Sequence, residues 1–478
     1  ATHGWCDGAG GTYTEADKLN YEDLIEKKSE ILQPVGFDCA DLDYGMFPHQ
    51  VALTRWALKR GRAAIFADTG LGKSRMQIAW ANEVHKRMPS APILILAPLA
   101  VAAQTVREGA AVGVSIRHCQ EQADCQNGIN ITNYDRLHKF DPSAFCAIVL
   151  DESSIIKHHD TKTLAALLDG FGRTPFKLCA TATPAPNDWT ELGTHAEFLG
   201  ACTRTEMLSE YFCHDGAETQ VWRLKGHARA AFWRWVSSWG AMVRKPSDLG
   251  FDDSAYNLPP LNIHEHAVIA EHASNGMLFA MEAQTLSERR DARRSSIAER
   301  VKDCAAMVNS NDAPWVVWCE LNAESEALVA AINGAVEVRG SMDTEKKESA
   351  LVDFAAGRIR VLVTKPSIAG WGLNWQHCNH MAFVGVTDSF EGYYQAVRRC
   401  WRFGQTKPVN VHLFVSEQEG AVAANLRRKE RDAMAMAEAL AKETNESIRA
   451  NVLGLSRTFN PYQPTVKIQT PDWLREAA

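Results

Sequence analysis

A glycine loop followed by a lysine has the clearest chemistry in this sequence. Residues 63–67 form a short apolar run, Gly70 and Gly72 follow, and Lys73-Ser74 begins a helical pattern. In such a strand–loop–helix layout, glycines let backbone N–H groups close around phosphate oxygens, and the helix N-terminus and the lysine add positive charge. The serine hydroxyl at the next position suits Mg²⁺. The segment therefore predicts a site for a nucleoside triphosphate.

The loop departs from the strict phosphate-loop pattern G-x-x-x-x-G-K-[ST], because Ala67 stands where its first glycine belongs. A chance turn before a helix is thus an alternative. Gln50, 23 positions before Lys73, can offer both groups of its amide to an adenine edge. A second glycine loop, residues 367–374, has no lysine placed as Lys73 is, so we expect no second triphosphate there. The full set of expected nucleotide contacts is Gln50, Asp68, Thr69, Gly70, Leu71, Gly72, Lys73, Ser74, Arg75 and Gly372.

An acidic pair follows an apolar run further along the chain. Residues 147–150 end at Asp151-Glu152. Because parallel strands present their carboxyl ends at one edge of a sheet, we expect this pair and Lys73 to share that edge. Asp151, together with Ser74, would hold Mg²⁺, and Glu152 would orient and deprotonate the water that attacks the γ-phosphate. The alternative is that the pair only caps the next helix.

Two arginines near residue 400 are spaced to reach one nucleotide. Residues 395–405 begin as a helix and end in a turn, and Arg399 and Arg402 are three residues apart on one helix face. Arginine fingers of this kind are worth about 10³ to 10⁵ in rate. A charged face on a solvent-exposed helix is the alternative. The predicted catalytic set is Lys73, Asp151, Glu152, Gln395, Arg399 and Arg402.

Strands that alternate with helices must position these groups. The alternation predicts an α/β fold with two doubly wound parallel sheets. Buried-strand runs occur at 93–98, 129–134, 147–150 and 176–184, and again at 315–319, 336–338, 361–363, 381–384 and 409–414. We expect five parts: an acidic N-terminal arm (1–45) with a helix near 15–32, a first lobe (46–200), a helical insertion (201–285), a second lobe (286–416), and a C-terminal brace helix and tail (417–478).

The composition indicates a globular protein of several domains. The chain has 478 residues, of which 46% are hydrophobic, and no apolar run is long enough to span a bilayer. Twelve cysteines without a C-x-x-C pair argue against a zinc site and favour reduced thiols, hence a cytoplasmic protein. The net charge of −7 arises in residues 1–45, since the remaining 48 acidic and 48 basic residues balance. A local basic groove is compatible with that neutral body.

The expected insertion combines cations with tryptophans. No acidic residue occurs from 219 to 247, where six basic residues alternate with four tryptophans. Such a mixture can follow a nucleic-acid backbone. However, Phe232, Trp235, Val236 and Trp239 recur at helical spacing, which predicts a buried stripe with arginines on the solvated face. We expect core packing for the tryptophans and phosphate contact for some of the basic residues.

Taken together, these segments resemble the Swi/Snf-type ATPases of helicase superfamily 2 from about Phe47 to Phe414. The resemblance implies two RecA-like lobes, ATP hydrolysis with Mg²⁺ between them, and movement along double-stranded DNA. It places nucleotide contacts on Gln50, Gly70, Gly72, Lys73 and Ser74, and hydrolysis on Asp151, Glu152, Gln395, Arg399 and Arg402. The segments that carry it are Gln395-x-x-x-Arg399-x-x-Arg402-x-Gly404-Gln405-Thr406-Lys407-Pro408-Val409, the loop 68–74, Asp151-Glu152, Thr181-Ala182-Thr183-Pro184 and Arg244-Lys245-Pro246-Ser247.

Three departures from the family pattern qualify the resemblance. Ser153-Ser154 replace an Ala-His pair, Thr69 replaces a methionine, and Ala182 replaces a glycine. The missing histidine bears on how hydrolysis is coupled to lobe movement. Because the insertions are small, we expect a compact bacterial or phage DNA translocase. We expect no membrane partner. The alternatives are a helicase that tracks on single-stranded DNA or RNA, and a non-hydrolysing, nucleotide-gated DNA-binding subunit of a methylation or restriction system.

Overall fold

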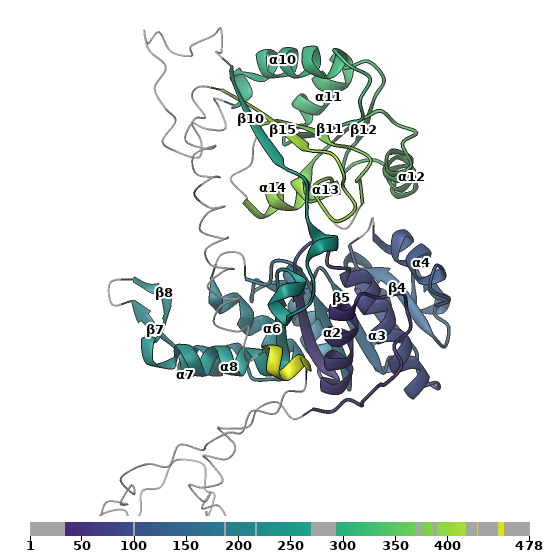
Figure 1. The fold of residues 1–478 in the computed structure, drawn as a ribbon, viewed down its shortest axis with the longest axis vertical. Helices are drawn as coiled ribbons and strands as arrows, with labels where there is room; N and C mark the ends of the chain where they lie inside the picture. The colour runs from purple at the N-terminus through teal and green to yellow at the C-terminus, as the bar shows by residue number, and fades with distance from the viewer. Residues whose placement is uncertain are drawn as a thin grey trace, which may run out of the picture.

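Two parallel α/β lobes, one above the other in Figure 1, make up most of the computed structural model. The structure describes residues 34–98, 101–185, 188–215, 218–268, 293–369, 374–385, 390–416, 428 and 448–453. The helix expected near 15–32, Gly372 and all but a few residues of the expected C-terminal brace helix lie outside the described residues.

The first lobe is built on a seven-stranded parallel sheet in the order β3-β4-β2-β5-β6-β1-β9. β2, β5 and β6 are buried at every residue, as expected for a parallel sheet covered on both faces. The four predicted strand runs of this lobe are therefore confirmed. The strands are β1 (Arg62–Ala67), β2 (Ile93–Ala97), β3 (Ile116–His118), β4 (Ile129–Asn133), β5 (Ala147–Asp151), β6 (Phe176–Ala180) and β9 (Gly240–Val243).

Helices cover this sheet and connect its strands. α3 follows directly from the glycine loop and contacts both β5 and β6, with Trp80 fully buried beneath it. The lobe therefore holds α3, and with it the end of the loop, against β5, the strand that leads into the acidic pair. The helices are α2 (Pro48–Arg60), α3 (Lys73–Arg87), α4 (Ala102–Ala110), α5 (Lys162–Phe171) and α6 (Leu192–Leu199), with short 3₁₀ turns at Gln122–Asp124, Tyr134–Lys139, Pro142–Ala144, Ser153–Ile156 and Trp189–Glu191.

The second lobe repeats the design with a six-stranded parallel sheet in the order β10-β15-β14-β11-β13-β12. In Figure 1, α13 and α14 lie at the end of this lobe that faces the first lobe. All five predicted strands are confirmed. The elements are β10 (Leu261–Val268), α10 (Ile297–Asn309), β11 (Trp315–Cys319), α11 (Asn322–Ala331), β12 (Ala335–Val338), α12 (Thr344–Ala355), β13 (Val361–Thr364), α13 (Pro366–Ala369), β14 (His380–Val384), α14 (Phe390–Val397) and β15 (Val409–Ser416).

The expected helical insertion is only partly helical. It contains α7 (Arg204–Tyr211) and α8 (Arg229–Trp239), but β7 (Phe212–Asp215) and β8 (Glu218–Leu224) form an antiparallel hairpin that projects from α7 in Figure 1. The same stretch also supplies β9 to the first sheet and β10 to the second. β9 is a short buried apolar strand that follows α8 without a turn signal, so the sequence does not separate it from the helix. β10 is an edge strand with mostly exposed side chains and shows no hydrophobic run of its own.

The tryptophan stripe of α8 packs in the core, as its spacing predicted. Phe232, Val236 and Trp239 are fully buried, whereas Arg229 and Arg234 are exposed. The chain then runs through 3₁₀ turns at Pro246–Leu249 and Ser254–Tyr256 before β10 begins the second lobe. The cysteines that the structure describes are all free thiols. None of the described helices is long and apolar enough to cross a membrane.

Candidate nucleotide site

Most of the predicted site residues meet at a pocket of about 310 Å³ between the lobes, which is within the usual range for a small-molecule site. Lobe 1 contributes the loop after β1 and the end of β5, and lobe 2 contributes the turn after α14. The structure brings these residues together from both lobes, while their individual roles remain predictions. The predicted residues that line the pocket are Gln50, Thr69, Gly70, Gly72, Lys73, Ser74, Arg75, Asp151, Glu152, Arg399 and Arg402.

Two glycines shape the loop that opens the pocket. Gly70 and Gly72 have φ angles of 91° and 83°, in the left-handed region that glycine adopts without strain. A Cβ atom on Gly72 would lie 2.2 Å from the side-chain nitrogen of Gln50, and one on Gly70 would lie 3.1 Å from the backbone nitrogen of Phe403 in lobe 2. The loop therefore needs glycine both for its backbone conformation and for the close approach of its neighbours.

Lys73 is the first residue of α3 and lies at the floor of the pocket. Its Nζ donates a hydrogen bond to the carbonyl oxygen of Ala67, 3.0 Å away. Burial lowers the pKa of Lys73, and the nearby carboxylates of Glu152, Asp68 and Asp151 partly offset this. A triphosphate in the pocket would supply the negative charge that a buried ammonium group favours.

Asp151 ends β5 within reach of the same helix. Its Oδ1 accepts a hydrogen bond of 2.6 Å from the side-chain amide of Gln77 on α3. Burial, reinforced by the neighbouring charge of Glu152, raises the pKa of Asp151 to about 7. A cation at this carboxylate would reverse that effect, because an opposite charge favours the ionised form.

Glu152 adopts a strained backbone conformation. Its φ of 51° makes it the single non-glycine residue with positive φ among those the structure describes, a conformation that costs a side-chain-bearing residue about 1–2 kcal/mol. The strain turns the chain sharply after β5, and the Glu152 carboxylate accepts a hydrogen bond of 3.3 Å from the hydroxyl of Thr181 at the end of β6. Backbone strain of this kind is concentrated at functional sites.

Three arginines, Arg398, Arg399 and Arg402, lie in the turn that follows α14. Arg399 and Arg402 line the pocket, and the Nε of Arg399 donates to the carbonyl of Gln395, 2.9 Å away. Burial, together with the charge of Arg399, lowers the pKa of Arg402 to about 9. A cluster of buried guanidinium groups that repel one another is suited to bind a polyanion. This donor set fits a triphosphate better than any neutral ligand.

A cluster of aromatic rings lines the mouth of the pocket, and sequence reasoning did not identify it as part of the site. The ring centroids of Phe47, Tyr256 and Phe403 lie 4.9–5.9 Å from one another. Phe47 is 39% exposed, which is unusual for a large apolar side chain and leaves its ring open to a flat ligand. The position of Phe403 next to Arg402 was the available signal for that residue; nothing in the sequence around Tyr256 indicated its role.

Gln50 lies beside these rings, and its amide is already engaged by the protein. Its side-chain oxygen accepts from the backbone N–H of Phe47 at 3.0 Å, and its nitrogen donates to the carbonyl of Leu71 at 2.9 Å. Both bonds fix the amide against the loop. A base could therefore be contacted by the acceptor capacity that remains on the oxygen and by the second N–H of the nitrogen, which lies 3.5 Å from the hydroxyl of Tyr256.

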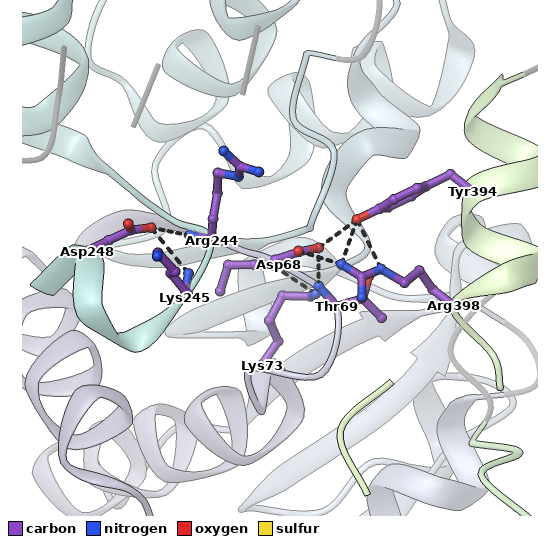
Figure 2. Close-up of polar contacts among 9 residues, drawn as sticks. Asp68, Thr69, Lys73, Arg244, Lys245, Asp248, Tyr394 and Arg398 are labelled. Atoms are coloured by element: carbon purple, nitrogen blue, oxygen red, sulfur yellow. Dashed lines mark hydrogen bonds and ion pairs between the residues drawn. The ribbon is translucent and has the colours of Figure 1, made fainter. Parts of the chain in front are cut away.

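Several predicted residues do not line the pocket. Leu71 is buried and contributes its carbonyl to Gln50, Gln395 is buried behind Arg399, and Gly372 lies outside the described residues. The carboxylate of Asp68 is bound by lobe 2 instead (Figure 2). Leu71, Gln395 and Asp68 support the pocket or lie beside it, so direct nucleotide contact by their side chains remains a prediction.

The oxygen ligands in the pocket suit Mg²⁺. Ser74 offers a hydroxyl and Asp151 a carboxylate, and Mg²⁺ is usually held by one or two such groups together with substrate phosphates and water. Among the described residues, no group of three or more His, Cys, Asp or Glu side chains could hold a metal without further ligands. When bound, the ion would neutralise phosphate charge.

The architecture now defines a class: a protein with two RecA-like lobes and a nucleotide pocket at their interface. Two family models match the chain, the SNF2-related domain over residues 49–212 and the helicase conserved C-terminal domain over residues 299–404. No curated protein matches it. The chain belongs to the Swi/Snf-type ATPases of helicase superfamily 2. Its two domains imply ATPase activity.

The departure from the family pattern after the acidic pair has a structural counterpart. Ser153 bonds to the buried ring of His195 on α6, with 3.1 Å between the serine hydroxyl and Nε2. Burial lowers the pKa of His195 to about 4. The histidine is therefore neutral at physiological pH, and its hydrogen bond with Ser153 links the turn after β5 to α6.

His195 should make the first lobe sensitive to mild acid. Its native pKa lies below the ordinary 6.5, so the unfolded chain binds a proton first, and stability falls as the pH drops from about 6.5 to about 4. Between pH 7 and pH 5 we expect the free energy of unfolding to fall by about 2 kcal/mol from this group. His195→Gln, which cannot titrate, should remove that part of the pH dependence in urea unfolding curves. Equal pH slopes for both proteins would contradict the prediction.

Proposed function

We propose that this chain is a DNA-dependent ATPase that translocates on double-stranded DNA in the cytoplasm of a bacterial or phage-infected cell. One observation carries the proposal: Glu152 lines two interlobe pockets at once. The first is the nucleotide pocket, and the second is a groove of about 370 Å³. A carboxylate shared by both is placed to make hydrolysis respond to whatever occupies the groove.

Both lobes contribute walls to this groove, which suits a polymer that must be moved. Lobe 1 supplies Asn133, Tyr134 and Ile155, and lobe 2 supplies Lys347 and Ser367. Ile155 is 40% exposed there and follows Glu152 by three residues. A ligand gripped from both sides would shift whenever the lobes rotate relative to each other. These features support a track for nucleic acid rather than a closed site for a metabolite.

Exposed cations outside the groove would add phosphate contacts. Arg223 on β8 and Arg229 and Arg234 on α8 face solvent in the stretch that lacks acidic residues. After β9, the carboxylate of Asp248 accepts from the backbone N–H groups of Arg244 (2.8 Å) and Lys245 (3.2 Å), and the Arg244 side chain points away from this turn in Figure 2. Cations of this kind provide sequence-independent, salt-sensitive affinity for DNA.

The groups in the nucleotide pocket divide the work of hydrolysis among themselves. Lys73 and the N–H groups of the loop would hold the phosphates from lobe 1, while Arg399 and Arg402 would contact them from lobe 2. Glu152 would take the proton of the attacking water. Loss of the γ-phosphate removes what both arginines hold, so the lobes can shift relative to each other and re-engage further along the duplex.

The experiment is the ATPase rate of the full chain with blunt duplex DNA, single-stranded DNA and RNA at one salt concentration. We expect duplex DNA to stimulate hydrolysis most, with the stimulation falling steeply as salt rises. Equal or greater stimulation by either single strand would instead indicate a helicase that tracks on one strand. ATP binding with negligible turnover on all three would indicate a nucleotide-gated DNA-binding subunit.

A further inference from the structure

Asp68 connects the phosphate loop of lobe 1 to α14 of lobe 2. The hydroxyl of Tyr394 donates to one carboxylate oxygen of Asp68 at 2.9 Å, and Nη2 of Arg398 donates to the other at 2.6 Å (Figure 2). These are charge-assisted contacts between segments more than 300 residues apart. Neither Tyr394 nor Arg398 is among the site residues expected from the sequence.

The arginine in this contact is held on every side. Its guanidinium lies 5.2 Å from the ring centroid of Tyr394 and 4.8 Å from that of Trp401, and its Nε donates to the Tyr394 hydroxyl at 3.1 Å. Only 8% of the Arg398 side chain and 24% of the Asp68 side chain are exposed. Burial lowers the pKa of Arg398, but Asp68 and Tyr394 more than offset this and raise it overall. The Arg398 guanidinium is therefore charged and largely shielded from water.

The lobe 1 end of the contact is equally well fixed. The backbone N–H of Asp68 donates to the carbonyl of Val243 on β9 at 2.9 Å, and the carboxylate accepts from the backbone N–H of Thr69 at 2.6 Å. The carboxylate thus has one orientation, set by the edge of the first sheet. If Arg398 moves away, its hydrogen bond to Asp68 must therefore break, because the loop that carries Asp68 is held in place and does not follow.

On lobe 2, one turn of backbone carries Arg398, which contacts Asp68, and the two finger arginines, Arg399 and Arg402. After Val397 the helix tightens to i→i+3 hydrogen bonds, from Arg399 to Ala396 and from Cys400 to Val397, each 3.2 Å. Because Arg398 and Arg399 are adjacent in this stiff turn, fixing the first side chain fixes the backbone that presents the second. Asp68 also neutralises one member of the arginine cluster, which leaves Arg399 and Arg402 for the phosphates.

We propose that Asp68, Arg398 and Tyr394 form an interlobe latch that holds the lobes together before nucleotide binds and sets the two finger arginines at the phosphate pocket. Arg398 is thus a positioning residue. Its kinetic consequences rest on the proposed ATPase function, whereas its effect on lobe separation does not.

The kinetic test is a double-mutant cycle of Asp68→Asn, Arg398→Gln and the pair together, with duplex DNA present. We expect each single change to lower kcat roughly tenfold, as for the loss of one charge-assisted hydrogen bond, with little change in the KM for ATP. The double variant should be no slower than either single variant. Arg398→Lys, which keeps the charge, should recover part of the loss. Multiplicative losses, or a loss confined to KM, would overturn the latch.

The control is Arg358→Gln. Arg358 also pairs with a carboxylate, Asp353, but both residues lie on the surface of lobe 2. Removing that pair should leave kcat and KM unchanged. A decrease like that of Arg398→Gln would show that any lost ion pair slows the enzyme, and the assignment of a positioning role would be wrong.

Lobe separation is tested without catalysis. Fluorophores attached through amber-codon residues at two exposed positions, Lys139 in lobe 1 and Lys346 in lobe 2, report the interlobe distance by energy transfer. In the absence of nucleotide and DNA, we expect Asp68→Asn and Arg398→Gln to lower the transfer efficiency relative to the unsubstituted chain and to Arg358→Gln. Identical efficiencies in all four proteins would overturn the latch, even if every ATPase measurement agreed with the proposed function. If DNA stimulation failed but efficiency fell as expected, the latch would stand without the translocase.

Discussion

Glu152→Gln is expected to abolish turnover while leaving ATP binding intact. Glutamine keeps the size and the αL backbone position of Glu152 and can still pair with Thr181, but it cannot accept the proton of the attacking water. Loss of a general base lowers a rate by about 10²- to 10⁴-fold. Single-turnover hydrolysis, measured beside equilibrium binding of ATP to the same preparation, separates the two effects.

Because Glu152 also lines the groove, its variant should trap a complex. We expect Glu152→Gln with ATP to hold duplex DNA longer than the unsubstituted chain, since the arginine contacts are no longer released by hydrolysis. Glu345→Gln, an exposed carboxylate on α12, is the control and should change neither rate nor DNA residence. Full turnover by Glu152→Gln would assign the base to another residue. The position of Glu152 between the two pockets would then no longer support the proposed function.

Removal of either finger arginine should have the second large effect. Arg399→Ala and Arg402→Ala are each expected to lower kcat by about 10³-fold or more, because each guanidinium stabilises charge that develops in the transition state. Lysine at either position should rescue little, since it lacks the planar fork of donors. Steady-state ATPase measurements on duplex DNA provide the test.

The two arginine variants should also be more stable than the unsubstituted chain when no nucleotide is present. Burial and the neighbouring charge of Arg399 lower the pKa of Arg402 to about 9. Without nucleotide, the charged guanidinium therefore destabilises the folded state. Arg402→Ala should therefore raise the melting temperature without ATP and reduce the gain in melting temperature on adding ATP. Arg339→Ala, a partly exposed arginine of the same lobe that pairs with the exposed carboxylate of Glu326, should change neither value by a comparable amount. A lower melting temperature for Arg402→Ala without ATP would show that the residue is structural.

Local sequence patterns were sufficient to predict the groups that belong to lobe 1. The loop around Lys73 and the acidic pair at Asp151 each follow an apolar strand, and both strands end at the same edge of one parallel sheet. Sequence therefore fixes their relative positions through a general property of parallel sheets. The meeting of the two lobes at one site was predicted from the spacing of Arg399 and Arg402 together with the family resemblance.

Features that depend on the tertiary structure were not predictable. β9 and β10 lie in the stretch expected to be a helical insertion. β9 directly continues the apolar stripe of α8, and β10 is an edge strand whose mostly exposed side chains give no hydrophobic signal. Tyr256 enters the pocket from a segment without any motif. Arg398 looked like one more charge on an arginine-rich helix, and its bond to Asp68 exists only once the lobes are assembled.

The segment that joins the lobes also forms part of the wall of the pocket. It leaves the first sheet after Val243 and enters the second at Leu261, and shortly before Leu261 it places Tyr256 against Phe403. Trp401 donates to the carbonyl of Pro259 at 2.7 Å, so the segment is also tied to the finger turn. In the proposed ATPase this connecting segment would contact the bound nucleotide, so release of ADP would depend on rotation of one lobe against the other. The rate of the cycle would then be set by ADP release rather than by hydrolysis.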